Sequence, residues 1–263
     1  MESNLTFATR LAERVGELLL EQFKRSDKNP QIKPDFSLVT DADLQADNWL
    51  TKEILNAYPQ DNLLSEELHP VYLNDAAGAV WVIDPLDGTT NFSLGLAYWG
   101  TSIALVEDGY PTLAVLHFPL LGETYTAQRG RGAALNGNAV SVRAPDPQDK
   151  STFFVCCSRT YRNYDIAIRY KARILGSAAY SFCTVVRSMA LIAFEARPKI
   201  WDLAAAWLLV QEAGGHIAAF DEASPFPLVP GTDYSQVDYP TLAAASPALM
   251  QKGKAQIQLK PGG

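Results

Sequence analysis

The chain has few residues that hold zinc or form disulfides, with only three cysteines and three histidines among 263 residues. An odd cysteine count, with Cys156 and Cys157 adjacent, does not form a disulfide framework. No histidine is spaced with a cysteine as in zinc sites. These scarcities exclude the disulfide-stabilised and zinc-finger classes, and we expect a reducing, cytoplasmic compartment.

Basic runs and long apolar runs are also missing. No run of Lys and Arg is longer than a pair, and the net charge is −7, which argues against a nucleic-acid or membrane-surface partner. No apolar stretch has the length of a membrane span, and charged residues interrupt the N-terminal segment where a signal peptide would be apolar. The apolar fraction of 48% is typical of a soluble globular protein, and the length of 263 residues fits one large domain or two small ones.

Hydrophobic periodicity predicts the elements of the first half. Apolar residues recur at helical spacing from Asn4 to about Lys24, and a second helix starts at Thr40 and stops at Pro59. The polar residues 25–36 between them predict a loop. Strands are expected at residues 79–83, 101–106, 112–116 and 122–128, the middle two forming a hairpin.

A polar, proline-containing segment around residues 145–147 predicts a boundary between an N-terminal part, residues 1–144, and a C-terminal part, residues 145–263. Beyond it we expect a strand at residues 152–157 and a loop-rich tail after residue 220. Three helices are expected between them, at residues 161–170, from Gly176-Ser177 through Met189, and at residues 201–213. Because strands and helices alternate in both halves, the fold class is α+β or α/β.

The most informative run is WVIDPLDGTTNF at residues 81–92. An apolar strand leads into two carboxylates, Asp84 and Asp87, and two hydroxyl residues then start a helix. Acidic oxygens beside free helix N–H groups hold divalent cations and a phosphate in one small volume, which metal-dependent hydrolysis of phosphate esters requires. The alternative is an ordinary turn, since Asp, Pro and Gly favour turns.

Three further acids are candidates, each with a structural alternative. Glu66, at the end of an apolar segment, either bridges metals or is simply solvated. Asp43, three residues after Thr40, either forms a capping box or orients Thr89 or a water molecule. Asp202 begins a helix, where the helix dipole alone favours a carboxylate. Spacing does not decide between these alternatives.

As an ordered set, these signals resemble the inositol monophosphatase family of metal-dependent, lithium-sensitive phosphatases. The family signature D-P-x-D-G-T-x-N-F is present at residues 84–92, and W-D-x-A-A with E-A-G-G is present at residues 201–205 and 212–215. Shorter elements at residues 39–43, 132–137 and 176–179 match as well. The resemblance covers roughly residues 5–220.

The resemblance implies a layered αβαβα sandwich with the site between its halves, and a homodimer, since family members are often dimers. It implies two or three Mg²⁺ ions held by Glu66, Asp84, the Leu86 carbonyl, Asp87 and Asp202. The implied catalytic residues are Thr89, Asp43 and Glu66. The implied substrate-binding residues are Gly88, Thr89, Gly176, Ser177, Ala178 and Glu195.

Charge supports this reaction. The four acidic side chains among the implied ligands carry a formal −4, so two Mg²⁺ neutralise them and a third makes the site attractive to a phosphate dianion. The expected activity is Mg²⁺-dependent hydrolysis of a phosphate monoester, inositol 1-phosphate giving myo-inositol and phosphate. No nucleic acid or membrane partner is expected.

The substrate has alternatives. Ser37 stands where many inositol monophosphatases carry Asp, which keeps histidinol phosphate, fructose 1,6-bisphosphate and 3′-phosphoadenosine 5′-phosphate as alternatives. Trp201, before Asp202, favours the inositol branch over histidinol phosphatases. A non-catalytic regulatory protein that keeps the fold is the alternative of a different class, and the presence of all four acids argues against it.

Overall fold

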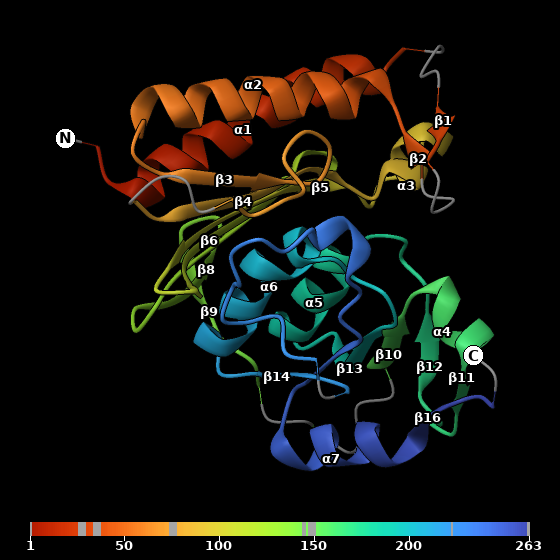
Figure 1. Cartoon of the computed structure of the whole chain (residues 1–263). Coiled ribbons are helices and arrows are strands. Elements are labelled where there is room, and N and C mark those ends of the chain that lie inside the picture. The colour runs from red at the N-terminus through yellow and green to blue at the C-terminus, as the bar shows by residue number, and fades with distance from the viewer. Residues whose placement is uncertain are drawn as a thin grey trace.

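The computed structural model describes residues 2–25, 30–33, 38–73, 78–143, 146, 151–221 and 223–261. Helices α1 (Asn4–Phe23) and α2 (Asp41–Ala57) cover one face of a seven-stranded sheet. Helices α5 (Ala178–Val186) and α6 (Ile200–Glu212) lie between this sheet and a five-stranded one, whose outer face carries α7 (Pro247–Gln256) (Figure 1). The αβαβα sandwich is therefore confirmed.

The first sheet has the order β3-β4-β5-β6-β7-β8-β9, and only the β3–β4 pair is parallel. Its strands are β3 (Asn62–Ser65), β4 (Val80–Asp87), β5 (Gly100–Glu107), β6 (Tyr110–Phe118), β7 (Glu123–Gln128), β8 (Gly132–Leu135) and β9 (Asn138–Val140). The predicted β5–β6 hairpin is confirmed, and its turn places Asp108 and Gly109 at positive φ. The strand predicted at 79–83 continues to Asp87.

Strand β4 is buried on both faces because helices cover each side of the sheet. Trp81 and Ile83 pack in the cluster under α1 and α2, whereas Val80 and Val82 pack in the cluster around α5 and α6. This alternation follows the two-residue period of a strand. It explains why the segment before the acids is continuously apolar, and it fixes the end of β4 between two packed layers.

The second sheet has the order β12-β10-β13-β15-β14. Strand β10 runs parallel to β12 and β13, and β15 runs antiparallel to β13 and β14. These strands are β10 (Phe153–Cys156), β12 (Lys171–Arg173), β13 (Ala190–Glu195), β14 (His216–Ala219) and β15 (Thr241–Ala244). The carboxyl ends of β10 and β13 therefore lie at one edge of the sheet, which is where side chains for ligands gather in parallel sheets.

The remaining elements are short. Strands β1 (Gln31–Ile32) and β2 (Leu38–Val39) pair with each other, as do β11 (Tyr164–Ile166) and β16 (Ile257–Leu259). Two short helices are α3 (Thr89–Leu94) and α4 (Ser158–Asn163), and 3₁₀ turns lie at Pro119–Leu121 and Tyr234–Gln236. No helix in the described ranges has both the length and the apolar character needed to cross a membrane.

Several predicted elements were wrong. The helix expected at residues 161–170 ends at Asn163, because the next residues pair as β11 with the distant strand β16. Such pairing is invisible to local periodicity. The helix expected to include Met189 ends at Val186, and Ser188 then adopts a φ of 60°. The tail predicted to be loop-rich also contains β15, α7 and β16, which were not predicted, and the predicted loop 25–36 contains β1.

Two predictions stay predictions. The boundary between residues 144 and 145 is not tested, and residues 144, 145 and 147–150 lie outside the described ranges. Ser37, on which part of the substrate choice depended, also lies outside them.

We expect Gly100→Ala to destabilise the first sheet. Gly100 pairs with Asp87, and an added Cβ would overlap the backbone carbonyl oxygen of His117 on β6. Because backbone cannot rotate away, the free energy of unfolding should fall by about 1–3 kcal/mol, measured by urea denaturation. Lys52→Ala, at an exposed position of α2, is the control. Unchanged stability in Gly100→Ala would contradict the close approach.

Candidate active site

Asp84 and Asp87 lie at the carboxyl end of β4 and line the same pocket. In a regular strand, residues three apart face opposite sides of the sheet. Here the register against β5 shifts between the two aspartates, with Pro85 between them, and a shift of this kind redirects side chains. Asp202 of α6 completes the group, and one carboxylate oxygen from each of the three lies within 4.8 Å of the others.

Packing three carboxylates together inside the protein is costly. Asp84 and Asp87 are 1% and 6% exposed. Burial, followed by repulsion from neighbouring acids, raises the pKa of Asp84 and Asp202 well above the usual value, and burial raises the pKa of Asp87 to about 6. Within the described residues, Oδ2 of Asp84 has no hydrogen-bond partner. Clustered carboxylate oxygens with an unused acceptor fit a hard divalent cation.

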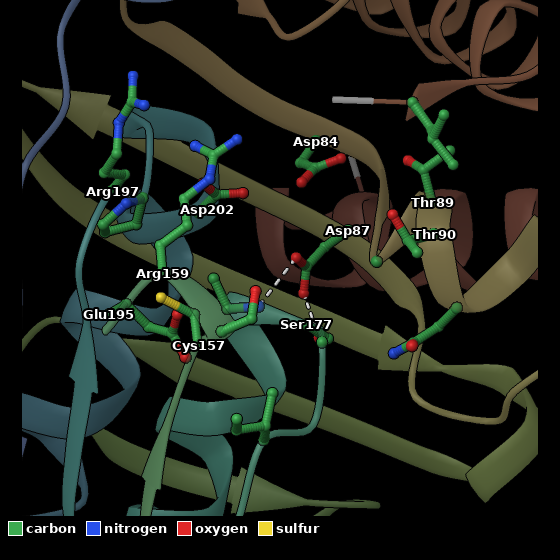
Figure 2. A pocket seen from close by; sticks show the side chains of 18 of the residues that line it. Asp84, Asp87, Thr89, Thr90, Cys157, Arg159, Ser177, Glu195, Arg197 and Asp202 are labelled. Atoms are coloured by element: carbon green, nitrogen blue, oxygen red, sulfur yellow. Dashed lines mark hydrogen bonds between the residues drawn. The ribbon is translucent and has the colours of Figure 1, made fainter. Parts of the chain in front are cut away.

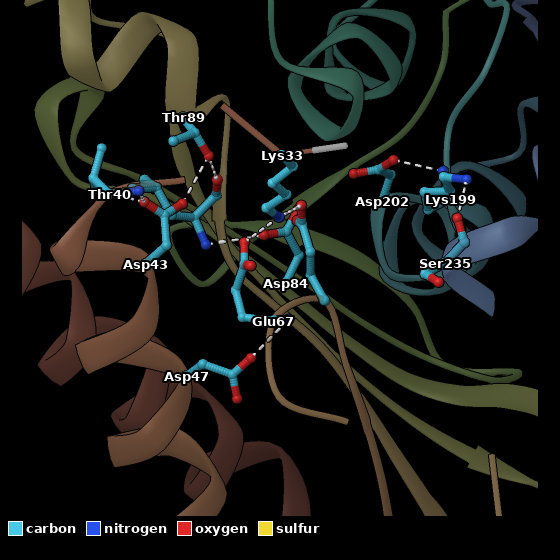
Figure 3. A network of polar contacts seen from close by, with 12 residues as sticks. Lys33, Thr40, Asp43, Asp47, Glu67, Asp84, Thr89, Lys199, Asp202 and Ser235 are labelled. Atoms are coloured by element: carbon cyan, nitrogen blue, oxygen red, sulfur yellow. Dashed lines mark hydrogen bonds and ion pairs between the residues drawn. The ribbon is translucent and has the colours of Figure 1, made fainter. Parts of the chain in front are cut away.

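Glu66 lines the pocket but is not one of the three acids whose oxygens converge, although its charge adds to the effect of burial on the pKa of Asp84 and Asp202. Its Oε1 lies 2.7 Å from Nζ of Lys33, which also contacts Oε1 of Glu67 at 2.6 Å (Figure 3). The two glutamates raise the pKa of Lys33 despite the opposing effect of burial, so this ammonium stays charged. Glu66 is therefore paired with a lysine that the sequence analysis did not identify.

Asp47 is a second residue that the sequence analysis missed. Its Oδ2 accepts hydrogen bonds from the backbone N–H groups of Glu67 and Leu68, at 3.0 and 3.2 Å (Figure 3). These bonds fix the turn that carries Glu66. The available signal was its spacing, four residues after Asp43, which places both acids on one side of α2.

Asp43 makes the contacts of both alternatives, because a carboxylate has two oxygens. Oδ2 accepts a hydrogen bond from the backbone N–H of Thr40 at 2.7 Å, which caps α2. Oδ1 accepts a hydrogen bond from the Thr89 hydroxyl at 2.7 Å (Figure 3). Burial raises the pKa of Asp43 to about 6. The Thr89 oxygen also lies 3.1 Å from the Leu86 carbonyl oxygen.

The carboxylate of Asp87 joins the two halves of the molecule. It accepts hydrogen bonds from the Ser177 hydroxyl and from the backbone N–H groups of Ala178 and Ala179, the latter two at 3.1 Å (Figure 2). The N-terminus of α5 favours this charge. Ser177 and Ala178, which the resemblance assigns to substrate, line the pocket and also hold Asp87.

The glycines beside the acids allow close backbone contacts. Gly88 adopts a φ of 91°, and a Cβ there would lie 2.7 Å from the Tyr98 carbonyl oxygen. Gly176 adopts a φ of 76°, and a Cβ there would lie 2.8 Å from the side chain of Asn91. Asn91 in turn donates to the Leu175 carbonyl at 2.7 Å, which ties α3 to the segment before α5.

The pocket has a volume of about 720 Å³ and contains every predicted site residue except Asp43, which reaches it through Thr89. Glu195, the last residue of β13, is 4% exposed, and burial raises its pKa to about 8. The pocket also contains residues that the sequence analysis did not identify, and they follow β10 and β13: Cys157, Ser158, Arg159, Arg162, Arg197 and Pro198 (Figure 2).

Comparisons with known proteins agree with this arrangement. The model of the inositol monophosphatase family matches residues 1–254. A Thermotoga maritima protein named fructose-1,6-bisphosphatase/inositol-1-monophosphatase is 33% identical over 84% of this chain and 88% of its own length. A Xylella fastidiosa protein named Nus factor SuhB is 36% identical over 81% of each. The solved structure of a Thermotoga maritima IMPase matches with a TM-score of 0.76 and 29% identity, covering 94% of this chain and 93% of that one.

We expect the metal-free protein to become less stable as the pH rises from about 5 to 8. The raised pKa values of Asp43 and Asp87, both about 6, mean that the folded state keeps protons which the unfolded state has released. The bound protons stabilise the folded state relative to the unfolded state. Their contribution is complete below the unfolded-state pKa of these aspartates and is lost as the pH rises through the folded-state pKa. In chelator, the Tm should fall by roughly 5–10 °C over this range.

Asp87→Asn is the matched variant for this measurement, since its amide does not titrate, and its Tm should fall less over the same range. Mg²⁺ should raise the Tm more at pH 8 than at pH 5. A Tm that rises with pH in chelator would contradict the raised pKa values of Asp43 and Asp87.

Proposed function

This chain belongs to the inositol monophosphatase family, and we propose that it is a Mg²⁺-dependent phosphatase whose substrate is inositol 1-phosphate. The observation that carries the proposal is the group of three aspartates from β4 and α6, beside the Thr89–Asp43 pair. Phosphatases of this kind need clustered hard ligands and a group that orients water. The chain supplies both in one pocket.

The proposed ligands of two or three Mg²⁺ ions are Glu66, Asp84, the Leu86 carbonyl, Asp87 and Asp202. Bound Mg²⁺ would neutralise these acids, attract the phosphate and lower the pKa of the attacking water. Backbone N–H groups of Gly88 and Thr89, at the start of α3, would bind phosphate oxygens. The proposed contacts of the alcohol are Gly176, Ser177, Ala178 and Glu195.

Thr89 and Asp43 would orient the water. When the Thr89 hydroxyl donates its only proton to Asp43, its oxygen lone pairs are left to accept a hydrogen bond from water. Asp43 is ionised above its pKa of about 6 and is then a proton acceptor one bond away. Glu66, held by its turn and by Lys33, would share in this step as the resemblance implies.

Two classes of alternative apply. Within the reaction, histidinol phosphate, fructose 1,6-bisphosphate and 3′-phosphoadenosine 5′-phosphate compete with inositol 1-phosphate, and the name of the Thermotoga relative covers two of these substrates. A non-catalytic role is the other class. It is kept as an alternative because the relative named Nus factor SuhB has a name that states no enzymatic reaction. Phosphate release from a panel of these esters, with and without Mg²⁺, decides between them. Inhibition by Li⁺, a homodimer and a cytoplasmic location remain predictions.

We expect Asp84→Asn to abolish turnover while the protein stays folded. A neutral amide is a poorer ligand for a hard cation, and Asp84 carries the unused acceptor oxygen. Phosphate release should fall by about 100-fold or more at saturating Mg²⁺. Asp108→Asn, in the turn at the other end of the β5 strand, is the matched control. Near-normal activity in folded Asp84→Asn would refute the metal assignment.

We expect Thr89→Ala to lower kcat by about 100-fold and to change the Mg²⁺ concentration for half-activation little. A hydroxyl that orients the attacking water acts mainly in the transition state. Thr89→Ser, which keeps the hydroxyl, should recover much of the rate. If Thr89→Ala reached full turnover at high Mg²⁺, the hydroxyl would serve metal binding instead.

A further inference from the structure

The position of the Asp202 carboxylate depends on the segment just before α6. Its Oδ2 accepts a hydrogen bond from the backbone N–H of Lys199 at 2.6 Å (Figure 3). Of the three acids whose oxygens converge, Asp202 is the one that comes from α6 and not from β4. The place of this carboxylate relative to Asp84 and Asp87 therefore follows the place of Lys199.

The side chain of Lys199 is held by residues far along the chain. Its Nζ donates a hydrogen bond to the backbone carbonyl oxygen of Ser235 at 2.5 Å (Figure 3) and lies 3.0 Å from Oδ1 of Asp238. The side chains of Lys199 and Asp238 are only 16% and 25% exposed. An ion pair that is largely sheltered from water interacts more strongly than a pair on the open surface.

Asp238 holds the same segment at a second point. Its Oδ2 accepts a hydrogen bond from Nε of Arg197, so the carboxylate contacts the cations on both sides of Pro198. The backbone N–H of Tyr239 donates to the Pro198 carbonyl oxygen at 3.0 Å. Within the described residues, Oδ1 of Asp238 has no hydrogen bond, so the ammonium of Lys199 is what compensates its charge.

The segment that carries Asp238 is anchored on the side of the first sheet. Backbone hydrogen bonds of 2.7 to 3.0 Å join residues 231–234 to residues 70–72, which follow the turn that carries Glu66. Because these bonds fix the segment independently of α6, Asp238 has a firm base from which to hold the start of that helix. The segment thus connects the two parts of the chain that bring Glu66 and Asp202 to the pocket.

We propose that Asp238 is a positioning residue for Asp202. It does not line the pocket, and it acts by fixing Lys199, whose backbone N–H orients the Asp202 carboxylate. Partners that orient a ligand without touching the ion raise metal affinity, because the ligand is then held in its binding geometry. This inference rests on the proposed function, in which Asp202 is a Mg²⁺ ligand, and adds a residue that neither the ion nor the substrate contacts.

The test measures Mg²⁺ binding by the whole protein in the absence of substrate. The Tm at pH 8 over a series of Mg²⁺ concentrations gives an apparent Kd. Asp238→Asn should raise this Kd by about 10-fold, and the Mg²⁺ concentration for half-maximal phosphate release should rise in step. The kcat at saturating Mg²⁺ should change little. Asp238→Glu keeps the carboxylate and should recover part of the affinity.

Lys199→Met is the second variant, because it removes the ammonium and keeps the backbone N–H that Asp202 accepts. It should raise the Kd for Mg²⁺ by a similar factor. Combining it with Asp238→Asn should add little, since both substitutions break the same contact. Effects of the two substitutions that multiply in full would overturn the proposal. If Asp238→Asn does not fold, the Kd of Lys199→Met decides.

Asp221→Asn is the matched control. Asp221 and Asp238 both act on the pKa of Tyr164, so they lie in one region, but Asp221 accepts its hydrogen bond from the backbone of Ala223. Its substitution removes the same charge and should leave the Kd for Mg²⁺ unchanged. A lowered Tm with an unchanged Kd in Asp238→Asn and Lys199→Met would show a purely structural contact and overturn the positioning role alone. A Tm of the unmutated protein that does not respond to Mg²⁺ would instead refute the proposed function, and this inference with it.

Discussion

The burial of like charges at the end of β4 is the constraint on which the rest of the site depends. Asp84, Asp87 and Asp202 repel one another in a place that water reaches poorly, so each needs donors. The fold supplies them from its own backbone: Leu86 N–H to Asp84, the start of α5 to Asp87, and Lys199 N–H to Asp202. The bonds that hold the acids therefore also join β4 to α5 within the middle of the sandwich. The geometry of the site and the packing of the layers therefore depend on the same contacts.

This coupling gives each acid two opposed effects. An acid placed to bind metal also destabilises the metal-free fold, because its charge is buried beside others of the same sign. Replacing it removes repulsion and chemistry together, which is the usual conflict between stability and activity at such sites. On the other face of the sheet, α2 contributes two more buried acids, and burial raises the pKa of Asp43 to about 6, as it does for Asp87. The carboxylate oxygens of Asp43 and Asp47 accept hydrogen bonds from N–H or hydroxyl donors.

The acids of the site could be predicted from the sequence because they belong to short, continuous segments. Residues 81–92 form a strand, a turn and a helix start in sequence order, so the motif is local. The shift of register that brings Asp84 and Asp87 to one pocket could not be predicted, since it depends on pairing with β5. Lys33, Asp47 and the arginines were missed for the same reason: their roles arise from contacts between distant elements. The helix wrongly predicted at residues 161–170 is the opposite kind of error. Local periodicity indicated a helix there, but residues 164–166 form a strand because they pair with the distant strand β16.

The acids and the arginines of the pocket come from different layers of this molecule. The acids are placed by β4 and α6, whereas the arginines lie on the segments that leave β10 and β13. Segments that follow strands tolerate substitution better than buried strand ends do, because fewer packed neighbours depend on them. In the described residues α4, which carries Arg159, makes no hydrogen bond to the aspartates, whereas the segment with Arg197 leads to Lys199, whose backbone N–H holds Asp202. Membership of the family consequently determines the bond that is broken more firmly than the alcohol that is released. The residues that follow β10 and β13 line the same pocket as the aspartates, so the contacts around the alcohol can differ while the acids stay the same.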